Sequence, residues 1–362
     1  MKRQSFFSSS LLLWDKIQNK RQMPWKGEKN PYKIWISEII LQQTRVLQGL
    51  AYYEKFIQHF PDIQTLATAN EEKVYKLWEG LGYYNRCKNL ITTAKFIHYN
   101  RNGIFPDVYE EIISLKGIGN YTASAILSFA FNRPYAVLDG NVYRVLSRFF
   151  GIETPINTSE GRKYYSELSQ TLLDKKEPGL YNQAIMDFGA TVCKPAVPLC
   201  DICPLQKKCV AFLDNKITSL PVNNKITKQK VRFFNYLVVG YNRHFYIKKR
   251  TANDIWQNLY EFILFESQSV FTKKDLLKNP EFLRLLGEKS FKIKSQSQPI
   301  TQKLTHQLIR GKFFYLEIEK PLLTNDKYVK VTGKELLKLP FPKLIADYLK
   351  DKNVSLNLNQ SI

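Results

Sequence analysis

Along the first two hundred residues, apolar side chains recur at intervals of three and four positions. This spacing places them on one face of an α-helix, so the pattern predicts an all-helical half of the chain with short connections. Phe60-Pro61 and Asn102-Gly103 are typical of helix ends, because proline cannot continue a helix and glycine favours the position after one. The predicted helices span about residues 32–59, 70–80, 85–99, 108–115 and 121–131.

The pattern changes at Val231, where apolar residues begin to alternate with polar ones. A period of two is typical of β-strands, and Gly240-Tyr241-Asn242-Arg243 supplies the turn of a β-hairpin. The second half is therefore predicted to be a mixed α+β domain. Its further elements are expected to be a helical pair over 271–286, strands near 302–307 and 312–319, and a final helix over 341–350.

The change of period, in a chain of 362 residues with 44% apolar residues, indicates two domains. Between them Pro221 and several asparagines interrupt regular structure, and Lys225, Lys228 and Lys230 are basic. Such a linker either follows a phosphate backbone or is merely solvated. The expected divisions are a helical domain over 1–213, a linker over 214–230, a second domain over 231–350 and a flexible polar tail over 351–362.

The N-terminal residues superficially resemble a signal peptide, with Lys2-Arg3 ahead of an apolar stretch. Three serines interrupt that stretch, and Asp15-Lys16 follows it at once without a small-residue cleavage site. It is predicted to be a capped amphipathic helix. Nowhere does the sequence contain about eighteen consecutive apolar residues, so no membrane span is predicted and a soluble protein is expected.

The formal net charge of +22 arises from 54 Lys and Arg against 32 Asp and Glu. A surface of this sign favours a polyanionic partner, with nucleic acid ahead of an anionic membrane, although a solubility effect is the plainer alternative. The chain has no block of six like charges, so the charge is expected on a folded surface and not in a disordered tail.

Four of the five cysteines lie close together: Cys193, Cys200, Cys203 and Cys209, with the spacing C-x6-C-x2-C-x5-C. Clustered cysteines in a reducing compartment indicate a shared metal centre. An iron–sulfur cluster is favoured over zinc, because a zinc ribbon would use two tight C-x2-C pairs, and disulfides or free thiols remain as a third alternative. The fifth, Cys87, lies on a predicted helix and is expected to be a small buried residue.

Leu115-Lys116-Gly117-Ile118-Gly119-Asn120 separates two predicted helices. Glycines two positions apart allow the backbone to approach an anion, and the amides at the next helix start point toward it. Gly117 and Gly119 therefore predict the phosphate-binding hairpin of a helix-hairpin-helix, with an ordinary helix–helix turn as the alternative. The hairpin is expected near residues 115–121.

Two carboxylates have environments that should separate their pKa values. Glu38 lies among isoleucines near Trp25 and Trp35, so burial should raise its pKa and make it a general acid. Asp139 precedes a predicted helix, where amides should keep it ionised opposite a developing positive charge. Such a pair suits cleavage of a glycosidic bond, which in DNA requires the base to be flipped out of the stack. A capping role for Asp139 and a partly exposed position for Glu38 are the plainer alternatives.

In their order along the chain, these motifs resemble those of the MutY-type adenine DNA glycosylases. The resemblance is dense over about residues 7–210 and thin beyond. It is carried by Met23-Pro24-Trp25, Pro31-Tyr32-Lys33, Ser37-Glu38, Leu41-Gln42-Gln43-Thr44, Leu81-Gly82-Tyr83-Tyr84, Leu115-Lys116-Gly117-Ile118-Gly119, Leu138-Asp139-Gly140-Asn141-Val142 and the four cysteines.

The resemblance implies excision of adenine opposite 8-oxoguanine, and of adenine opposite guanine, in base excision repair. Glu38 matches the acid that protonates the adenine, Asp139 the carboxylate that stabilises the sugar cation, and Asn141 a neighbour that orients the reacting groups. Tyr121 stands where related glycosylase/lyases carry a Schiff-base lysine, so a monofunctional enzyme is expected.

The resemblance also assigns residues that hold the DNA. Gln43 and Tyr83 match residues that fill the gap in the duplex and wedge beside the oxidised guanine, and Gln42 and Thr44 belong to the same motif as Gln43. Lys26 departs from the family's arginine, which puts a bidentate contact there in doubt. The expected wall of the adenine pocket is Arg21, Met23, Trp25, Lys26, Leu41 and Gln183.

The second domain resembles the Nudix-like domain of the family but lacks the R-E-x-x-E-E hydrolase signature. It is therefore expected to recognise 8-oxoguanine without hydrolysing diphosphates. Leu304-Thr305-His306 falls where the family has a Phe-Ser-His turn that inspects the oxidised base, so Thr305 and His306 are candidate recognition residues. His306 could equally be a structural histidine of a strand.

Taken together, the expected protein is a monomeric helix-hairpin-helix glycosylase with one 4Fe–4S cluster and a Nudix-like α+β domain. Its expected partner is double-stranded DNA that contains 8-oxoguanine:adenine mispairs, and its expected location is the bacterial cytoplasm, on the nucleoid. The cluster is interpreted as a structural clamp for a loop that carries Lys194, Lys207 and Lys208. Two alternatives are a glycosylase/lyase acting on oxidised pyrimidines and a DNA-damage-binding protein without catalysis.

Overall fold

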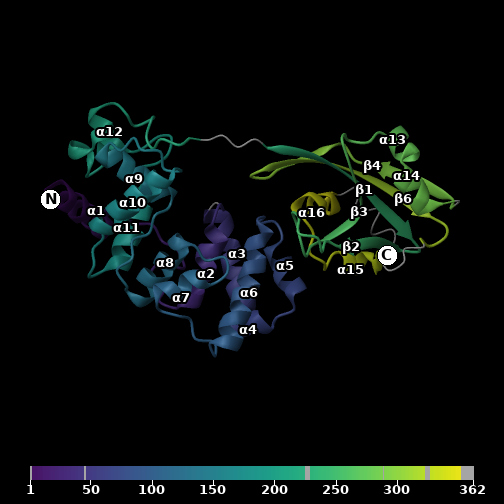
Figure 1. The fold of residues 1–362 in the computed structure, drawn as a ribbon, viewed down its shortest axis with the longest axis horizontal. Coiled ribbons are helices and arrows are strands. Elements are labelled where there is room, and N and C mark those ends of the chain that lie inside the picture. Colours follow the sequence, from purple (N-terminus) through teal and green to yellow (C-terminus); the bar gives the residue numbers. More distant parts are fainter. Residues whose placement is uncertain (1, 45, 225–228, 288, 323–326, 352–362) are drawn as a thin grey trace. The chain divides into compact units, whose positions relative to one another are not determined.

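The computed structural model describes residues 2–44, 46–224, 229–287, 289–322 and 327–351 (Figure 1). The chain forms two compact units, which we call the helical unit (residues 1–68 and 89–225) and the sheet unit (residues 69–88 and 226–362). The change of unit near residue 225 falls inside the expected linker. Residues 69–88, which the sequence pattern places in the helical domain, group instead with the sheet unit.

The helical unit is built from eleven α-helices of the described chain and two short 3-10 helices in the cysteine loop. Helix α6 begins in the sheet unit and continues into this one. The elements are α1 (Lys2–Gln18), α2 (Pro31–Leu41), α3 (Val46–His59), α4 (Ile63–Thr68), α6 (Tyr84–Asn100), α7 (Tyr109–Ser114), α8 (Asn120–Phe131), α9 (Gly140–Phe150), α10 (Ser159–Leu172), α11 (Pro178–Thr191), η1 (Cys200–Ile202), η2 (Gln206–Lys208) and α12 (Val210–Leu213).

The single long helix predicted over 32–59 is wrong, because two helices, α2 and α3, occupy this stretch. Gln42 leaves the helical region with ψ 116°, and Gln43 has a positive φ of 57°. A left-handed residue cannot continue a right-handed helix. The break turns residues 42–44 toward the cavity described below.

The other predicted helices of this unit are confirmed to within a few residues, including the N-terminal helix α1. One apolar core joins α1, α9, α10 and α11, with Phe7 packed on Phe149 at 4.9 Å and Trp14 edge-on to Phe188. Close approach of α11 to its neighbours depends on glycine. A Cβ on Gly189 would lie 2.6 Å from Asn141 Cβ on α9, and one on Gly179 would lie 2.8 Å from the Ser128 carbonyl on α8.

The sheet unit contains a seven-stranded sheet of order β4-β6-β1-β3-β2-β7, with β5 also paired to β6. Strands β1 and β6 are parallel, and all the other pairs are antiparallel. The elements are α5 (Glu71–Trp78), β1 (Lys230–Tyr241), β2 (His244–Lys249), β3 (Tyr260–Ser267), α13 (Lys273–Lys278), α14 (Pro280–Leu286), β4 (Phe291–Gln296), β5 (Ile300–Lys303), β6 (Gln307–Ile318), β7 (Val329–Thr332), α15 (Gly333–Leu336) and α16 (Lys343–Lys350).

Helices cover both faces of this sheet. Leu276 of α13 and Phe282 of α14 pack on Leu237 and Leu316, whereas Tyr348 of α16 stacks on Phe313 from the other face with the ring centres 3.9 Å apart. The predicted hairpin at 240–243 and the helical pair near 271–286 are confirmed.

The strand predicted over 302–307 ends at Lys303, and residues 304–306 form a turn before β6. Strands β3, β4 and β7 were not predicted, because their short runs lack a clear alternation. Of the tail expected over 351–362, residues 352–362 lie outside the described residues, as do Lys225 and Lys228 of the linker. Within the described ranges, no helix has the length and apolar character needed to cross a membrane.

Candidate active site

A cavity of about 760 Å³ opens in the helical unit where α2, α8, α9 and α11 converge. It brings together thirteen of the residues that the sequence singled out. These are Arg21, Trp25, Glu38, Leu41, Gln42, Gln43, Thr44, Gly117, Gly119, Tyr121, Asp139, Asn141 and Gln183.

Other lining residues were not named as candidate site residues, although Ser37, Asn120 and Gly140 stand within the quoted motifs. Several follow from helical spacing, since Ile34 precedes Glu38 by one turn and Met186 follows Gln183 by three residues. The missed lining residues are Ile34, Ser37, Val46, Asn120, Thr122, Phe129, Gly140 and Met186. Met23 and Lys26, which were expected in the wall, are absent from the lining of the described cavity.

Glu38 projects from α2 into this cavity, and its side chain is buried. Burial raises the pKa of Glu38 from 4.5 to about 7. An interaction with the Tyr121 hydroxyl opposes part of the rise, and the negative charge of Asp139 adds to it. Glu38 therefore carries its proton in a substantial fraction of molecules at neutral pH, as a general acid must.

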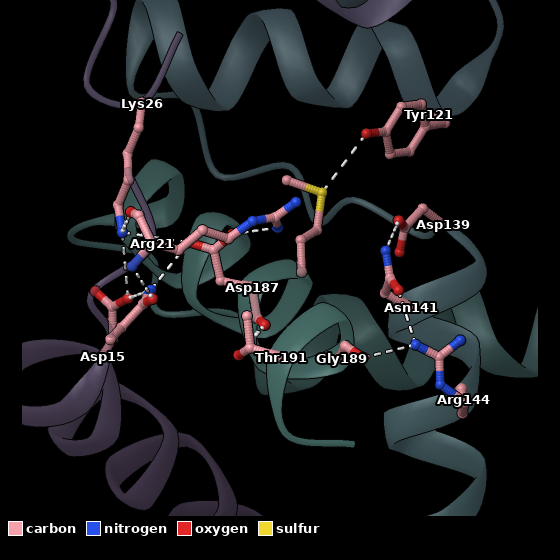
Figure 2. Close-up of polar contacts among 12 residues, drawn as sticks. Asp15, Arg21, Lys26, Tyr121, Asp139, Asn141, Arg144, Asp187, Gly189 and Thr191 are labelled. Carbon is pink, nitrogen blue, oxygen red and sulfur yellow. Dashed lines mark hydrogen bonds and ion pairs between the residues drawn. The ribbon is translucent and has the colours of Figure 1, made fainter. Parts of the chain in front are cut away.

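Asp139 is the N-cap of α9, as its position in the sequence suggests. One carboxylate oxygen accepts the Val142 amide at 2.8 Å, and the other accepts the Asn141 side-chain amide at 2.7 Å (Figure 2). These donors favour the ionised form of the carboxylate, which is the effect expected from the sequence. Burial raises the pKa of Asp139, and the hydrogen bonds together with the Arg144 charge offset only part of that rise.

Tyr121 stands at the start of α8, with its hydroxyl between the Glu38 carboxyl and the sulfur of Met186. It donates a hydrogen bond to Met186 Sδ at 3.5 Å (Figure 2). Burial, followed by the charges of Glu38 and Asp139, raises the pKa of Tyr121 well above its ordinary value. The side chain therefore stays neutral at physiological pH and offers the cavity a hydroxyl, not an amine.

A second layer of contacts holds Asn141 in place. The Arg144 guanidinium donates to Asn141 Oδ1 at 2.8 Å and to the Gly189 carbonyl at 2.7 Å (Figure 2). Its Nε donates to the Cys193 carbonyl at 2.7 Å. Helix α9 thus connects the cavity directly to the start of the cysteine loop.

Beside the cavity, the buried carboxylate of Asp187 forms ion pairs with two basic side chains. Arg21 Nη1 lies 2.7 Å from Asp187 Oδ1, and Lys26 Nζ lies 3.2 Å from Oδ2, which also accepts Asn19 Nδ2 at 2.9 Å (Figure 2). Arg21 lines the cavity, whereas Lys26 reaches only its supporting carboxylate. Asp187 was not singled out by the sequence, although it shares one face of α11 with Gln183.

The predicted hairpin connects α7 to α8 and lies at the rim of the cavity. Gly117 has φ 83°, and a Cβ there would lie 2.6 Å from Asn89 Cβ, so glycine is required on both counts. Gly119 is the N-cap of the twelve-residue helix α8, without a side-chain cap, and a Cβ there would meet nothing within 4 Å. The first amides of α8 remain available to an anion.

The four clustered cysteines line one small hollow in the helical unit. Arg148 on α9 holds its wall by donating to the carbonyls of Lys194 at 2.7 Å and Pro195 at 2.8 Å, and its Nη1 lies 3.6 Å from Cys193 Sγ. Burial raises the pKa of Cys203 to about 12, and the other three thiols add to the rise. In the described residues, no group of three or more Cys, His, Asp or Glu is spaced to hold a single metal ion.

Tyr83, Thr305 and His306 all belong to the sheet unit. The Tyr83 hydroxyl lies 3.2 Å from Thr305 Oγ1, and Tyr83 has a positive φ of 49°. Both Thr305 and His306 are exposed in the turn between β5 and β6, and the His306 carbonyl accepts the amide of Lys230 at 2.9 Å. His306 is therefore a turn residue, and the alternative of a strand histidine is wrong.

Known proteins resemble this chain in both sequence and fold. Residues 36–170 match the HhH-GPD superfamily of base excision DNA repair proteins. The adenine DNA glycosylase of Buchnera aphidicola from Acyrthosiphon pisum is 39% identical over 264 residues, which is 72% of this chain and 75% of that protein. The human adenine DNA glycosylase is 41% identical over 215 residues, which is 57% of this chain and 39% of the human one.

Two solved structures resemble 59% of the chain. A thermostable thymine-DNA glycosylase matches over 98% of its own length with TM-score 0.55 and 28% identity. An endonuclease III in a non-covalent DNA complex matches over 97% of its length with TM-score 0.52. At 19% identity, the second likeness concerns the fold alone.

Proposed function

Since the chain belongs to the adenine DNA glycosylases and excises adenine from DNA in base excision repair, we propose that its target is adenine mispaired with 8-oxoguanine. The observation that supports adenine excision is that Glu38 and Asp139 line the same buried cavity. The first has a pKa near neutrality, and the second is surrounded by hydrogen-bond donors. Adenine opposite guanine is proposed as a second substrate.

In the proposed reaction, the adenine enters the cavity after flipping out of the duplex. Glu38 transfers its proton to a ring nitrogen of the base, and the bond between that base and C1′ of the sugar then breaks. Asp139 faces the positive charge that develops on the sugar, and Asn141 keeps one Asp139 oxygen oriented by its 2.7 Å hydrogen bond. A water adds to C1′, which completes the hydrolysis.

The enzyme is a monofunctional N-glycosylase. Strand cleavage by a lyase would need an amine that attacks the sugar, and Tyr121 offers only a hydroxyl with a raised pKa. This observation counts against the alternative of a glycosylase/lyase for oxidised pyrimidines.

We propose further that Cys193, Cys200, Cys203 and Cys209 hold one 4Fe–4S cluster. The donor set fits this group, because four thiols share one hollow whose walls Arg144 and Arg148 tie to α9. Four cysteine thiolates are the ligand set that such a cluster requires. The cluster would act as a cross-link of the loop that carries Lys194, Lys207 and Lys208. Four irons per chain in anaerobically purified protein would support this assignment, and one zinc would exclude it.

Discrimination for 8-oxoguanine is proposed to reside in the sheet unit, which we interpret as Nudix-like. The supporting observation is that Tyr83 and Thr305 meet at 3.2 Å while His306 stays exposed beside them. Residues 222 positions apart in the sequence therefore form one small surface within this unit. The protein is further proposed to act as a monomer in the cytoplasm.

The test is a glycosylase assay on duplexes with 8-oxoguanine:adenine, guanine:adenine or 8-oxoguanine:cytosine pairs, with alkali added to half of each sample. We expect adenine release that is fastest opposite 8-oxoguanine, and strand breaks only after alkali. Replacing both Thr305 and His306 with alanine should reduce the preference for 8-oxoguanine over guanine more than it slows release opposite guanine. An equal loss on both duplexes would refute the recognition role.

A further inference from the structure

One part of the sheet extends beyond the two helices that cover one of its faces. Strands β1 and β6 pair along eleven positions, and their starting halves project past α13 and α14 (Figure 1). Strand β5 continues this part of the sheet beside β6, and α16 packs on its other face. We call this part the tongue and define it as residues 230–235 of β1, the strand β5, the turn 304–306 and residues 307–312 of β6. The turn with Thr305 and His306 lies at its end.

The two faces of the tongue differ. On one face Ile309 is buried, and Gly311 lies so close to α16 that a Cβ would meet Leu344 Cδ2 at 2.7 Å. Arg232 on this face is neutralised by Asp254 at 2.8 Å and Glu266 at 2.7 Å. This face is packed against α16, and its arginine is paired with two carboxylates.

The other face is open and basic. The register pairs Thr301 with Arg310 and Lys303 with Leu308. Lys303 and Arg310 are therefore diagonal neighbours on one face, with their Cα atoms about 7–8 Å apart. Both side chains are exposed. The Arg310 guanidinium lies 5.9 Å from the centre of the Phe233 ring, which supports it, and Val231 beside it is 44% exposed.

Acidic residues are missing from this part of the sequence. Residues 289–316 contain five lysines and one arginine but no Asp or Glu, and residues 229–235 contain none either. Lys312 is less available than its neighbours, because its Nζ donates to the Phe271 carbonyl at 3.1 Å. Lys303 and Arg310 are therefore two like charges held side by side, an arrangement that favours an anion with closely spaced charges.

We propose that the open face of the tongue binds the phosphate backbone of the duplex through Lys303 and Arg310. The inference rests on the proposed function, since the turn that would inspect the base opposite adenine lies directly after Lys303. A duplex that reaches Thr305 and His306 must pass beside this face. The contact reads no sequence, so it adds affinity for damaged and undamaged duplexes alike.

The effect can be estimated from counterion release. Each phosphate that a protein neutralises on duplex DNA contributes about 0.9 to the slope of log affinity against log salt. Losing two contacts should lower the slope by about 1.8. Salt from about 50 to 200 mM is a fourfold change. Over this range, the ratio of parent affinity to variant affinity should therefore fall by about tenfold.

The experiment compares full-length protein with the double variant K303A/R310A. The control variant K334A/K338A removes the same charge from two exposed lysines, one in α15 and one two residues after its end. Helix α15 packs on β2 and β7 at the opposite edge of the sheet. Dissociation constants are measured from about 50 to 200 mM salt on two duplexes. One contains 8-oxoguanine opposite 2′-fluoro-deoxyadenosine, which resists cleavage, and the other is undamaged. If the double variant has a lowered melting temperature, K303Q/R310Q replaces it.

We expect the tongue variant to bind both duplexes about tenfold more weakly at low salt, with the slope lowered by about 1.8, and the control to follow the parent protein. Equal slopes for the tongue and control variants would overturn the proposal. A loss confined to the 8-oxoguanine duplex would also overturn it, because those residues would then read the lesion and not the backbone. A parent protein that excises adenine without preferring 8-oxoguanine would instead refute the proposed function.

Discussion

Replacing Asp187 with asparagine tests how the cavity keeps Arg21 in place. The Asp187 carboxylate is 1% exposed and accepts from Arg21 at 2.7 Å, Lys26 at 3.2 Å and Asn19 at 2.9 Å. Asparagine keeps the volume but can accept at only one of the two oxygen positions, and it turns an amide donor toward the other donors. Arg21 and Lys26 would also lose the negative charge that offsets the repulsion between their positive side chains.

The expected cost follows from burial. Removing one partner of a fully buried ion pair costs about 3–5 kcal/mol. Because the side chains of Arg21 and Lys26 are 21% and 24% exposed, water can partly replace the carboxylate, and we expect about 2–3 kcal/mol of unfolding free energy to be lost. Of this, about 1–2 kcal/mol should appear as misplacement of Arg21 in the cavity, which slows adenine release about 5- to 30-fold.

A double-mutant cycle separates these two effects. Single-turnover adenine release is measured for the parent, D187N, R21A and D187N/R21A, with urea unfolding of each. If Asp187 acts through Arg21, D187N should slow release by less than about twofold once Arg21 is alanine. D15N is the matched control, since Asp15 lies 3.9 Å from Lys26 Nζ in the same network. Fully additive rate effects of D187N and R21A would refute the reasoning and leave Asp187 with a purely structural role.

Three further predictions concern the cavity and the cysteine loop. Because burial raises the pKa of Glu38 to about 7, the acid form is lost as pH rises, and adenine release should fall about tenfold per pH unit above that value. E38Q should be nearly inactive at every pH, and a flat profile of the parent protein to pH 9 would contradict the assignment. G189A puts a methyl group 2.6 Å from Asn141 Cβ, so it should cost about 1–3 kcal/mol in urea unfolding and slow release, whereas an unchanged rate would show that α9 can shift freely. R148K keeps the positive charge but loses the planar guanidinium that reaches the carbonyls of Lys194 and Pro195 together, so it should cost about 1–3 kcal/mol of unfolding free energy and lower the iron content per chain. An unaltered unfolding midpoint would argue against the role of Arg148 in the loop.

Much of the helical unit follows from local signals. Apolar spacing and helix-ending residues place most helices, and the Asn70 and Asp139 caps stand where the sequence suggests. The break at Gln43 could not be seen in this way, because it carries neither glycine nor proline. Gln43 lines the cavity in a left-handed conformation that residues other than glycine seldom adopt.

The properties of the site residues could likewise be predicted only where neighbours in the sequence determine them. An apolar neighbourhood in the sequence was enough to predict a raised pKa for Glu38, since the flanking isoleucines are buried with it. For Asp139 the capping amides were visible in the sequence, but the burial that outweighs them comes from distant elements. The partners of Asp187 lie more than 160 positions away, so no local pattern could reveal them.

The grouping of residues 69–88 with the sheet unit bears on the order in which the chain acquires its structure during synthesis. Glu72 and Tyr75 bind Tyr260 and Asn258, at 2.6 and 3.0 Å, yet all of residues 89–225 are translated between them. Domains generally fold as units as they emerge, and contacts between distant residues form late. We therefore expect α5, which is translated well before the rest of the sheet unit, to be among the last helices to become stable. A substitution in this early segment should delay the completion of the C-terminal sheet.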